Sequence, residues 1–306
     1  MSDKRKLEAT FKSQDTEEWL DIHFTRPLGL LWANFFIRLG VHPNVVTVFS
    51  IILGAAAGVM FYFPDIRFTL AGILLLVWAN IYDSTDGQMA RMTGRKTRWG
   101  RILDGFAGDV WFFAIYFFIC LRLTPVWGPW IWLLASFSGF VCHAKQCQLA
   151  DYYRNIHLYF LKGEAGSELD SSEKLRAAFR TLPWRGNVVW KVFLMSYANY
   201  TRSQEGMTPA FQTLKRQLDA RFGRVLPARL REDFRAGSRP LMKYANILTF
   251  NVRALVLYAV LLCGEPWLYF VFEVTVMNIL LFYLRARHER LCRRITSQLN
   301  TYEAAV

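Results

Sequence analysis

The fold and most of the candidate site follow from one stretch, Asp83-Ser-Thr-Asp86-Gly87-Gln-Met-Ala90-Arg91, then eight residues, then Gly100-Arg-Ile-Leu-Asp104. It continues a strongly apolar run from Leu70 to Ile81. An α-helix turns about 100° per residue, so residues three, four and seven apart share one face. We therefore expect the two aspartates, Gly87 and Ala90 to form one stripe of a helix, with Arg91 at its edge.

The chemistry of this stripe favours a metal and a phosphate. Carboxylates at the end of an apolar run are costly beside lipid, so they must face a protein interior or a polar cavity. Asp83, Asp86 and Asp104 offer the oxygen ligands that Mg²⁺ or Mn²⁺ prefer. Arg91 offers a planar fork that suits a phosphate, and the small residues Gly87 and Ala90 let a ligand or a helix come close.

This stretch resembles the signature of the CDP-alcohol phosphotransferase (CDP-alcohol phosphatidyltransferase) family, Asp-x2-Asp-Gly-x2-Ala-Arg-x8-Gly-x3-Asp-x3-Asp. Seven positions match in residue and spacing: Asp83, Asp86, Gly87, Ala90, Arg91, Gly100 and Asp104. The resemblance implies a site for two metal ions, Mg²⁺ or Mn²⁺, held by the three aspartates. It also implies nucleotide contacts at Asp83, Gly87, Ala90 and Arg91.

The last acid of the signature departs from this pattern. Position 108 is Gly108, and the next acid is Asp109, one residue late. The resemblance implies that this acid binds metal and acts as the general base, so we assign both roles to Asp109. In an ideal helix Asp109 would point roughly 140° away from Asp104. We expect a π-bulge at Gly105–Gly108 to absorb the extra residue; the alternative is a site without this base.

Composition indicates a helical membrane protein. Apolar residues make up 53% of the 306 residues, and they gather in long runs. The net charge of +13 comes from basic residues beside these runs, which favours membrane topology and anionic headgroups over nucleic acid. The five cysteines form no CxxC pair, so we expect neither a disulfide framework nor a zinc site.

The predicted fold is an all-α integral membrane protein with six transmembrane helices. The spans are expected near Val45–Phe63, Phe68–Arg91, Ile102–Leu123, Trp130–Leu149, Ala245–Cys263 and Trp267–Arg285. An N-terminal amphipathic helix, residues 16–39, is expected to lie at the membrane interface with a break at Pro27; a short first span is the alternative.

Four regions follow from this pattern. Residues 1–43 hold the N-terminal tail and interfacial helix, and 44–149 hold the first four spans with the motif. Residues 150–240 form a helical cytosolic insertion, and 241–306 hold the last two spans and a basic tail. Helices in the insertion are expected near Ser172–Arg180, Val188–Tyr200, Pro209–Phe222 and Ala228–Arg235.

Orientation follows from the distribution of charge. Six spans place the 91–101 loop, the insertion and both termini on one side, and these segments carry most of the basic residues. By the positive-inside rule that side is cytoplasmic, so the site faces the cytoplasm, at the inner or plasma membrane if the protein is bacterial. Gly54 and Gly58 form a GxxxG pattern that we assign to packing within the bundle, with a homodimer face as the alternative.

A second polar cluster follows the fourth predicted span. It comprises His143, Lys145, Gln146 and Arg154, with Arg253 inside the fifth span. Ionisable groups at membrane depth are candidate functional residues, so these side chains are candidates to hold the phosphate of an acceptor or of a lipid. The alternatives are snorkelling of Lys145 and Arg154 to the interface, a structural His143, and an ion pair for Arg253.

The resemblance implies a membrane transferase of phospholipid synthesis. Such an enzyme moves a phosphoryl-linked group from a CDP-linked donor to a hydroxyl acceptor and releases CMP. Either CDP-diacylglycerol donates to inositol, inositol phosphate or another polar alcohol, or a CDP-linked alcohol donates to a lipid hydroxyl such as diacylglycerol or ceramide. Expected partners are donor, acceptor and membrane lipids, without nucleic acid. Two rivals are a transporter with an acidic pocket and a catalytically impaired family member that acts as a binding subunit.

Overall fold

The structure is a computed structural model that describes residues 13–95, 98–223 and 225–302, without the side chains of residues 98, 99, 101, 102, 104 and 165. The described residues form helices and loops and contain no strand, which confirms the predicted all-α class. The α-helices longer than ten residues are α2 Arg26–Arg38, α3 Pro43–Tyr62, α4 Ile66–Thr93, α5 Arg98–Trp127, α7 Ala144–Lys162, α9 Val188–Met207, α10 Pro209–Phe222, α11 Ala228–Ile247, α12 Phe250–Leu262 and α14 Asn278–Ser297.

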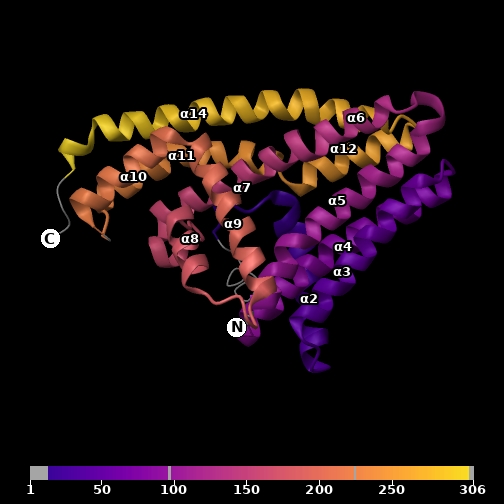
Figure 1. The fold of residues 1–306 in the computed structure, drawn as a ribbon, viewed down its shortest axis with the longest axis horizontal. Coiled ribbons are helices and arrows are strands. Elements are labelled where there is room, and N and C mark those ends of the chain that lie inside the picture. Colours follow the sequence, from indigo (N-terminus) through magenta and orange to yellow (C-terminus); the bar gives the residue numbers. More distant parts are fainter. Residues whose placement is uncertain (1–12, 96–97, 224, 303–306) are drawn as a thin grey trace. The chain divides into compact units, whose positions relative to one another are not determined.

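Shorter segments connect them. The short α-helices are α6 Trp130–Ser136, α8 Ser172–Thr181 and α13 Trp267–Phe272. Three π-helical segments, η1 Asp21–Thr25, η2 Phe137–His143 and η4 Glu273–Met277, lie within longer helical runs. The chain divides into two compact units (Figure 1): unit 1 is Met1–Ala144 with Phe250–Thr275, and unit 2 is Lys145–Thr249 with Val276–Val306.

The core of unit 1 is a bundle in which α3 packs against both α4 and α5. Its GxxxG pair faces α5, because a Cβ at Gly54 would lie 2.1 Å from Trp111 Cδ1 and a Cβ at Gly58 would lie 2.7 Å from the Ala114 carbonyl carbon. Only glycine permits these approaches. The pair therefore packs inside the bundle, as predicted, and a dimer face built on these two glycines is wrong.

The N-terminal helix packs on the motif helix α4. A Cβ at Gly29 of α2 would lie 2.6 Å from Gln88 Nε2, and this amide donates to the Arg26 carbonyl oxygen at 3.1 Å. The expected break at Pro27 is wrong: the helical run continues through this residue, which occupies the first turn of α2 directly after the π-helix η1. Proline is tolerated there because its missing N–H falls among the unpaired donors of a helix start.

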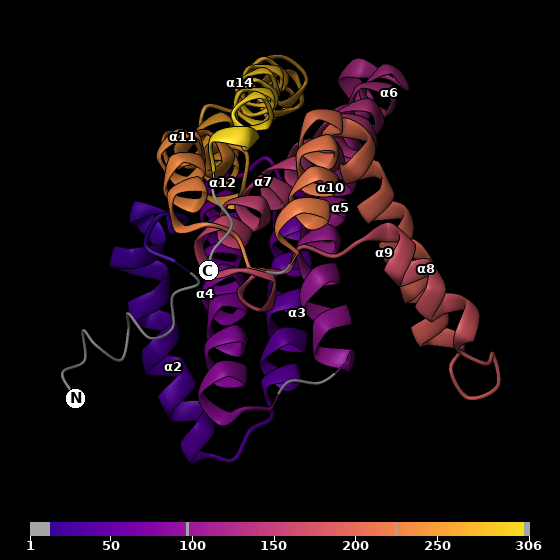
Figure 2. The same ribbon diagram turned by 90° about the vertical axis from the view of Figure 1, so that its left-hand side faces the viewer.

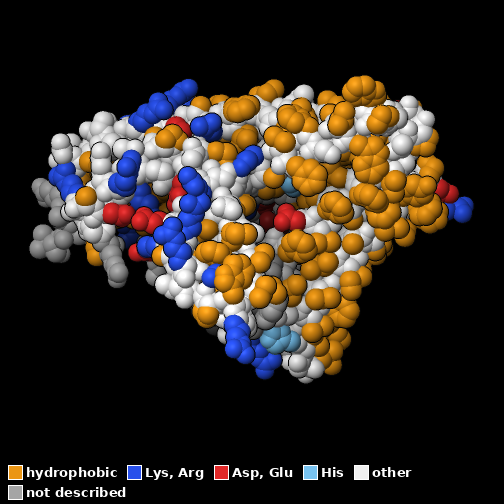
Figure 3. Space-filling view, in the orientation of Figure 1, with side chains coloured by type: hydrophobic (Ala, Val, Ile, Leu, Met, Phe, Trp, Pro, Cys, Tyr) orange, Lys and Arg blue, Asp and Glu red, His pale blue; other side chains and the backbone are white. Residues whose placement is uncertain are grey.

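Five helices of the described chain are long and apolar enough to cross a membrane: Pro43–Tyr62, Ile66–Thr93, Gly105–Trp127, Ala228–Leu262 and Trp267–Ser297. Figure 3 shows hydrophobic side chains gathered on the surface of α3, α4 and α5, as lipid exposure requires. The predicted span Trp130–Leu149 is not among them, since its apolar part ends at Cys142 and polar residues begin at His143. The count of six spans and the interfacial position of α2 stay predictions.

Unit 2 holds the helices expected in the insertion. Helices α8, α9, α10 and α11 begin at Ser172, Val188, Pro209 and Ala228, as the sequence predicts, and α9 and α11 run further than expected. Figure 2 shows α8 and α9 as a hairpin. Helix α14 packs against α10 and α11 through buried residues that include Phe211, Leu230 and Ile295.

Candidate active site

The motif aspartates lie on one continuous helix. Helix α4 runs without interruption from Ile66 to Thr93, so Asp83, Asp86 and Ala90 share a face as expected. Asp86 is only 4% exposed and Asp83 is half-buried. Gly94 ends the helix in the left-handed conformation, with φ of 68°, which glycine adopts without strain. The apolar run and this glycine fix where the stripe lies along the helix.

Gly87 and Arg91 form a small cradle on the same face. A Cβ at Gly87 would lie 3.3 Å from Arg91 Nη1, which is closer than most Cβ contacts. Because Gly87 has no side chain, the guanidinium of Arg91 lies against this turn of the helix while the residue stays exposed. A cation beside a backbone without a side chain is suited to a phosphate that approaches closely.

The expected π-bulge at Gly105–Gly108 is wrong. Helix α5 is α-helical from Arg98 to Trp127, and π-helical geometry occurs instead in η1, η2 and η4. Gly108 therefore occupies the helical register of the missing acid, and Asp109 is rotated by one residue. Asp104 lies in the first turns of α5, and its side chain is outside the described part.

Asp109 is exposed and interacts electrostatically with His143. His143 is the last residue of the π-helix η2, and its ring packs against Phe112 with a centroid distance of 4.4 Å. Phe112 lies one turn after Asp109 on α5. The rotated acid and the histidine of the second predicted cluster thus belong to one region of unit 1, and π-helical segments often occur at functional sites.

The ring of His143 contacts a buried ion pair formed by Arg253 and Glu273. Glu273 Oε1 lies 3.0 Å from His143 Nδ1, and Arg253 donates to the same carboxylate. The side chains of Arg253 and Glu273 are both 0% exposed. Ser138 and Tyr269 donate hydroxyl hydrogen bonds to Glu273 at 3.0 and 2.8 Å, and Tyr116 donates another.

The ion-pair interpretation of Arg253 is therefore confirmed. Sequence reasoning missed Glu273. The signal was present, because Glu273 is the one charged residue between Trp267 and Leu284, and Arg253 is the one charged residue between Ala245 and Cys263. Lone opposite charges in consecutive apolar runs predict a partner for each other.

The other members of the second cluster lie in unit 2 and bond neighbouring helices. Gln146 Nε2 donates to Asn278 Oδ1 at 2.8 Å. Arg154 donates to Asn246 Oδ1 through Nε at 2.9 Å and Nη2 at 2.7 Å. Lys145 donates to the Ser203 hydroxyl of α9 and to Gln148 Oε1 of its own helix at 3.2 Å. These contacts account for each polar group by helix packing, whereas a phosphate-binding role for the three stays a prediction.

The metal implied by the motif is compatible with the described residues. The two aspartates of α4 present hard oxygen donors on one helix face, as divalent cations such as Mg²⁺ require. Among the described side chains no group of three or more His, Cys, Asp or Glu residues is positioned to hold a metal ion. The third expected ligand, Asp104, lies outside those side chains.

Comparison with known proteins agrees with the motif. Residues 40–152 match the family model of the CDP-alcohol phosphatidyltransferases. The chain is 40% identical to a phosphatidylinositol phosphate synthase of Streptomyces avermitilis over 81 residues, which are 26% of this chain and 32% of the relative. It is 35% identical to an archaetidylinositol phosphate synthase of Pyrococcus horikoshii over 110 residues, 36% of this chain and 56% of the relative.

A phosphatidylinositol phosphate synthase of Mycobacterium tuberculosis is 31% identical over 94 residues, which are 28% of this chain and 42% of the relative. The chain thus spans 32% to 56% of the length of these three relatives. The matched residues contain the whole of α3, α4, α5 and α6 and the first part of α7, with the seven motif positions. Residues 40–152 of this chain thus resemble a domain of the CDP-alcohol phosphatidyltransferase family.

Proposed function

We propose that this protein is a membrane transferase of phospholipid synthesis that moves a phosphoryl-linked group from a CDP-linked donor to a hydroxyl acceptor and releases CMP. The observation that carries this proposal is the match of seven motif residues on α4 and α5, inside the residues that match the family model. The buried Asp86 supports it, because a carboxylate that is 4% exposed on an apolar helix is costly to keep unless it serves a site.

Each motif residue takes a role from its chemistry. Asp83, Asp86 and Asp104 would hold Mg²⁺ or Mn²⁺ as a two-metal site, since the family is generally dependent on divalent metals. When bound, such ions neutralise the donor pyrophosphate and stabilise charge on the CMP leaving group. Arg91 binds a phosphate oxygen, and Gly87 with Ala90 lets the nucleotide approach the helix closely.

The general base is proposed to be Asp109, with His143 as its neighbour. A role for Asp109 as a metal ligand would require the π-turn that α5 does not contain, so we separate this residue from the metal site. An exposed carboxylate beside a histidine is suited to remove the proton of an acceptor hydroxyl. The buried pair of Arg253 and Glu273 acts behind His143 as a positioning group.

The acceptor is proposed to be an inositol phosphate or a related polar alcohol phosphate, with a CDP-linked lipid as donor. The names of the relatives support this direction, since three of them are synthases of phosphatidylinositol or archaetidylinositol phosphate. The basic loop after α4 supports a cytoplasmic site that a soluble acceptor reaches directly.

One experiment separates the two directions of transfer. Purified protein in lipid nanodiscs is given CDP-diacylglycerol with inositol phosphate, or a CDP-linked alcohol with diacylglycerol, and the lipid products are identified by mass spectrometry. We expect phosphatidylinositol phosphate from the first mixture alone. A product from the second mixture alone would reverse the direction of transfer. No product from a broad panel of donors and acceptors would favour a non-catalytic binding role. This role is the second candidate, because Gly108 stands at the position of the final acid of the motif.

A further inference from the structure

The corner between α9 and α10 is fixed to α14 by two side chains one turn apart. Arg285 Nε donates to the Met207 carbonyl oxygen at 3.0 Å. The backbone N–H of Ala210, in the first turn of α10, donates to Glu289 Oε2 at 2.9 Å. An acceptor at this position satisfies one of the unpaired donors of a helix start. These two hydrogen bonds therefore fix the end of α9 and the start of α10 against α14.

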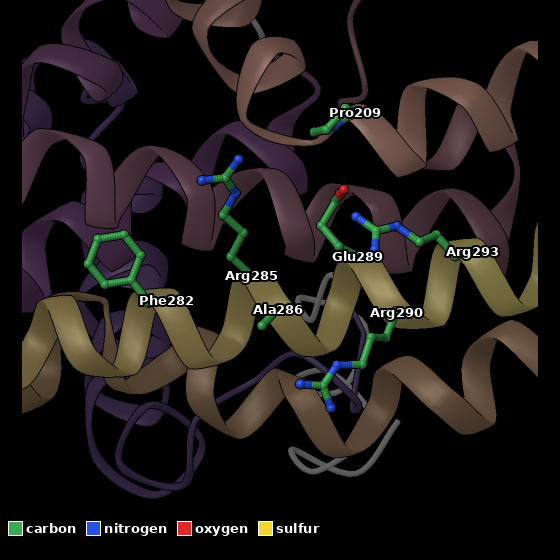
Figure 4. A pocket seen from close by; sticks show the side chains of 7 residues that line it. All are labelled: Pro209, Phe282, Arg285, Ala286, Glu289, Arg290 and Arg293. Carbon is green, nitrogen blue, oxygen red and sulfur yellow. The ribbon is translucent and has the colours of Figure 1, made fainter.

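A hollow of about 380 Å³ lies beside this corner, lined by Pro209, Phe282, Arg285, Ala286, Glu289, Arg290 and Arg293. Figure 4 shows that Arg285, Glu289 and Arg293 extend to the side of α14 that faces Pro209, whereas Arg290 extends to the other side in this view. The guanidinium of Arg293 reaches back toward Glu289 in the same view. The lining carries three cationic groups and one carboxylate.

These cationic groups have donors to spare. Arg290 and Arg293 are exposed and make no hydrogen bond or ion pair with any residue that the structure describes. Arg285 uses only Nε within the described chain, so both of its terminal nitrogens remain as donors. Basic residues on a helix surface are often only solvated. Here Arg285 and Arg293 line a hollow next to the first turn of α10, whose backbone is hydrogen-bonded to Glu289.

Glu289 adds a second and independent feature. Its side chain is 6% exposed, and Oε1 is buried and accepts no hydrogen bond within the described structure. A buried acceptor without a donor costs free energy, which the Glu289 carboxylate would recover by turning toward a hydroxyl group of a ligand. The arginines favour an anion, whereas the carboxylate disfavours a bare anion that lacks a hydrogen-bond donor. The arginines and the carboxylate together therefore favour an anion that also carries a hydrogen-bond donor.

We propose that this hollow binds a phosphate ester that carries hydroxyl groups. Arg285 and Arg293 hold the phosphate through charge-assisted hydrogen bonds, and a hydroxyl of the ester donates to Glu289. The same chemistry occurs in a soluble polyol phosphate and in the headgroup of a lipid such as phosphatidylglycerol. The proposal does not rest on the transfer activity, because none of these residues belongs to the motif.

The test compares two arginines of the same helix. Arg293→Gln removes a lining cation, and Arg287→Gln removes an exposed cation of α14 that does not line the hollow. The protein is held in phosphatidylcholine nanodiscs with a chelator, so that metal-dependent binding at the motif does not contribute. Glycerol 3-phosphate and inorganic phosphate are titrated by calorimetry at constant ionic strength, and native mass spectrometry counts phosphatidylglycerol retained from mixed nanodiscs.

We expect Arg293→Gln to weaken binding roughly tenfold in the arm that responds, because one charge-assisted contact is lost. Arg287→Gln should leave binding unchanged. Glu289→Gln should reduce the preference for glycerol 3-phosphate over inorganic phosphate. A response in the calorimetric arm identifies a soluble ester, and a response in the lipid arm identifies a headgroup. Equal losses from both arginine variants, or no binding in either arm, would overturn the proposal.

Discussion

The buried pair of Arg253 and Glu273 gives the most direct prediction about stability. In the variant Glu273→Leu, the guanidinium of Arg253 would remain buried at 0% exposure without its carboxylate. The hydroxyls of Ser138 and Tyr269, now 3.0 and 2.8 Å from that carboxylate, would also lose their acceptor. Removal of one partner of a buried pair typically costs about 3–5 kcal/mol. We expect a loss of this size in the free energy of unfolding.

The double variant Arg253→Leu with Glu273→Leu should recover much of this loss, because no uncompensated charge remains inside the bundle. The assay is reversible unfolding in mixed detergent micelles, read by circular dichroism, for the wild type, both single variants and the double variant. This cycle isolates the coupling between the two side chains. Losses below about 1 kcal/mol for Glu273→Leu, or a double variant whose loss equals the sum of the single losses, would refute the reasoning.

Three further predictions concern unit 1. Gly58→Ala should destabilise the protein by about 1–3 kcal/mol in the same unfolding assay, because its Cβ would lie 2.7 Å from the Ala114 backbone; Gly206→Ala, with nothing within 4 Å, is the control and should cause no loss. Gln88→Ala should speed proteolysis near α2, because the 0% exposed amide joins α2 to α4; an unchanged cleavage rate would contradict this. Deletion of Gly108 should abolish folding by rotating the rest of α5 by about 100°, and an active, well-expressed deletion would show that α5 adjusts its register.

Much of the fold could be predicted because its signals are local. Proline and glycine mark the boundaries: α3 and α10 begin at Pro43 and Pro209, and Gly94 ends α4. The apolar runs predicted five helices that are long enough to cross a membrane, whereas the sixth predicted span, Trp130–Leu149, is not among them. The glycine pair at Gly54 and Gly58 predicted close packing, because a missing side chain is visible in sequence whatever partner it meets.

The features that sequence reasoning missed depend on packing between distant segments. A π-turn forms where neighbouring helices favour an extra residue, so the glycines at 105 and 108 were a poor guide, and π-geometry occurs at Phe137–His143 instead. Gln88 lies off the acidic stripe and would be read as a tolerant position, yet it is buried against α2. The role of Glu273 could be predicted only by comparing two separate apolar runs, each of which contains a single charged residue.

The central claim is that the motif supports metal-dependent release of CMP. The direct measurement is the initial rate of CMP formation by the purified protein with CDP-diacylglycerol and inositol phosphate, with Mg²⁺ or with a chelator. The wild type should release CMP only with the metal, Asp86→Asn should lose nearly all of this rate, and Asp219→Asn, an exposed aspartate of α10, should keep it. CMP release that persists in the chelator, or in Asp86→Asn, would contradict the assignment of the site to this motif.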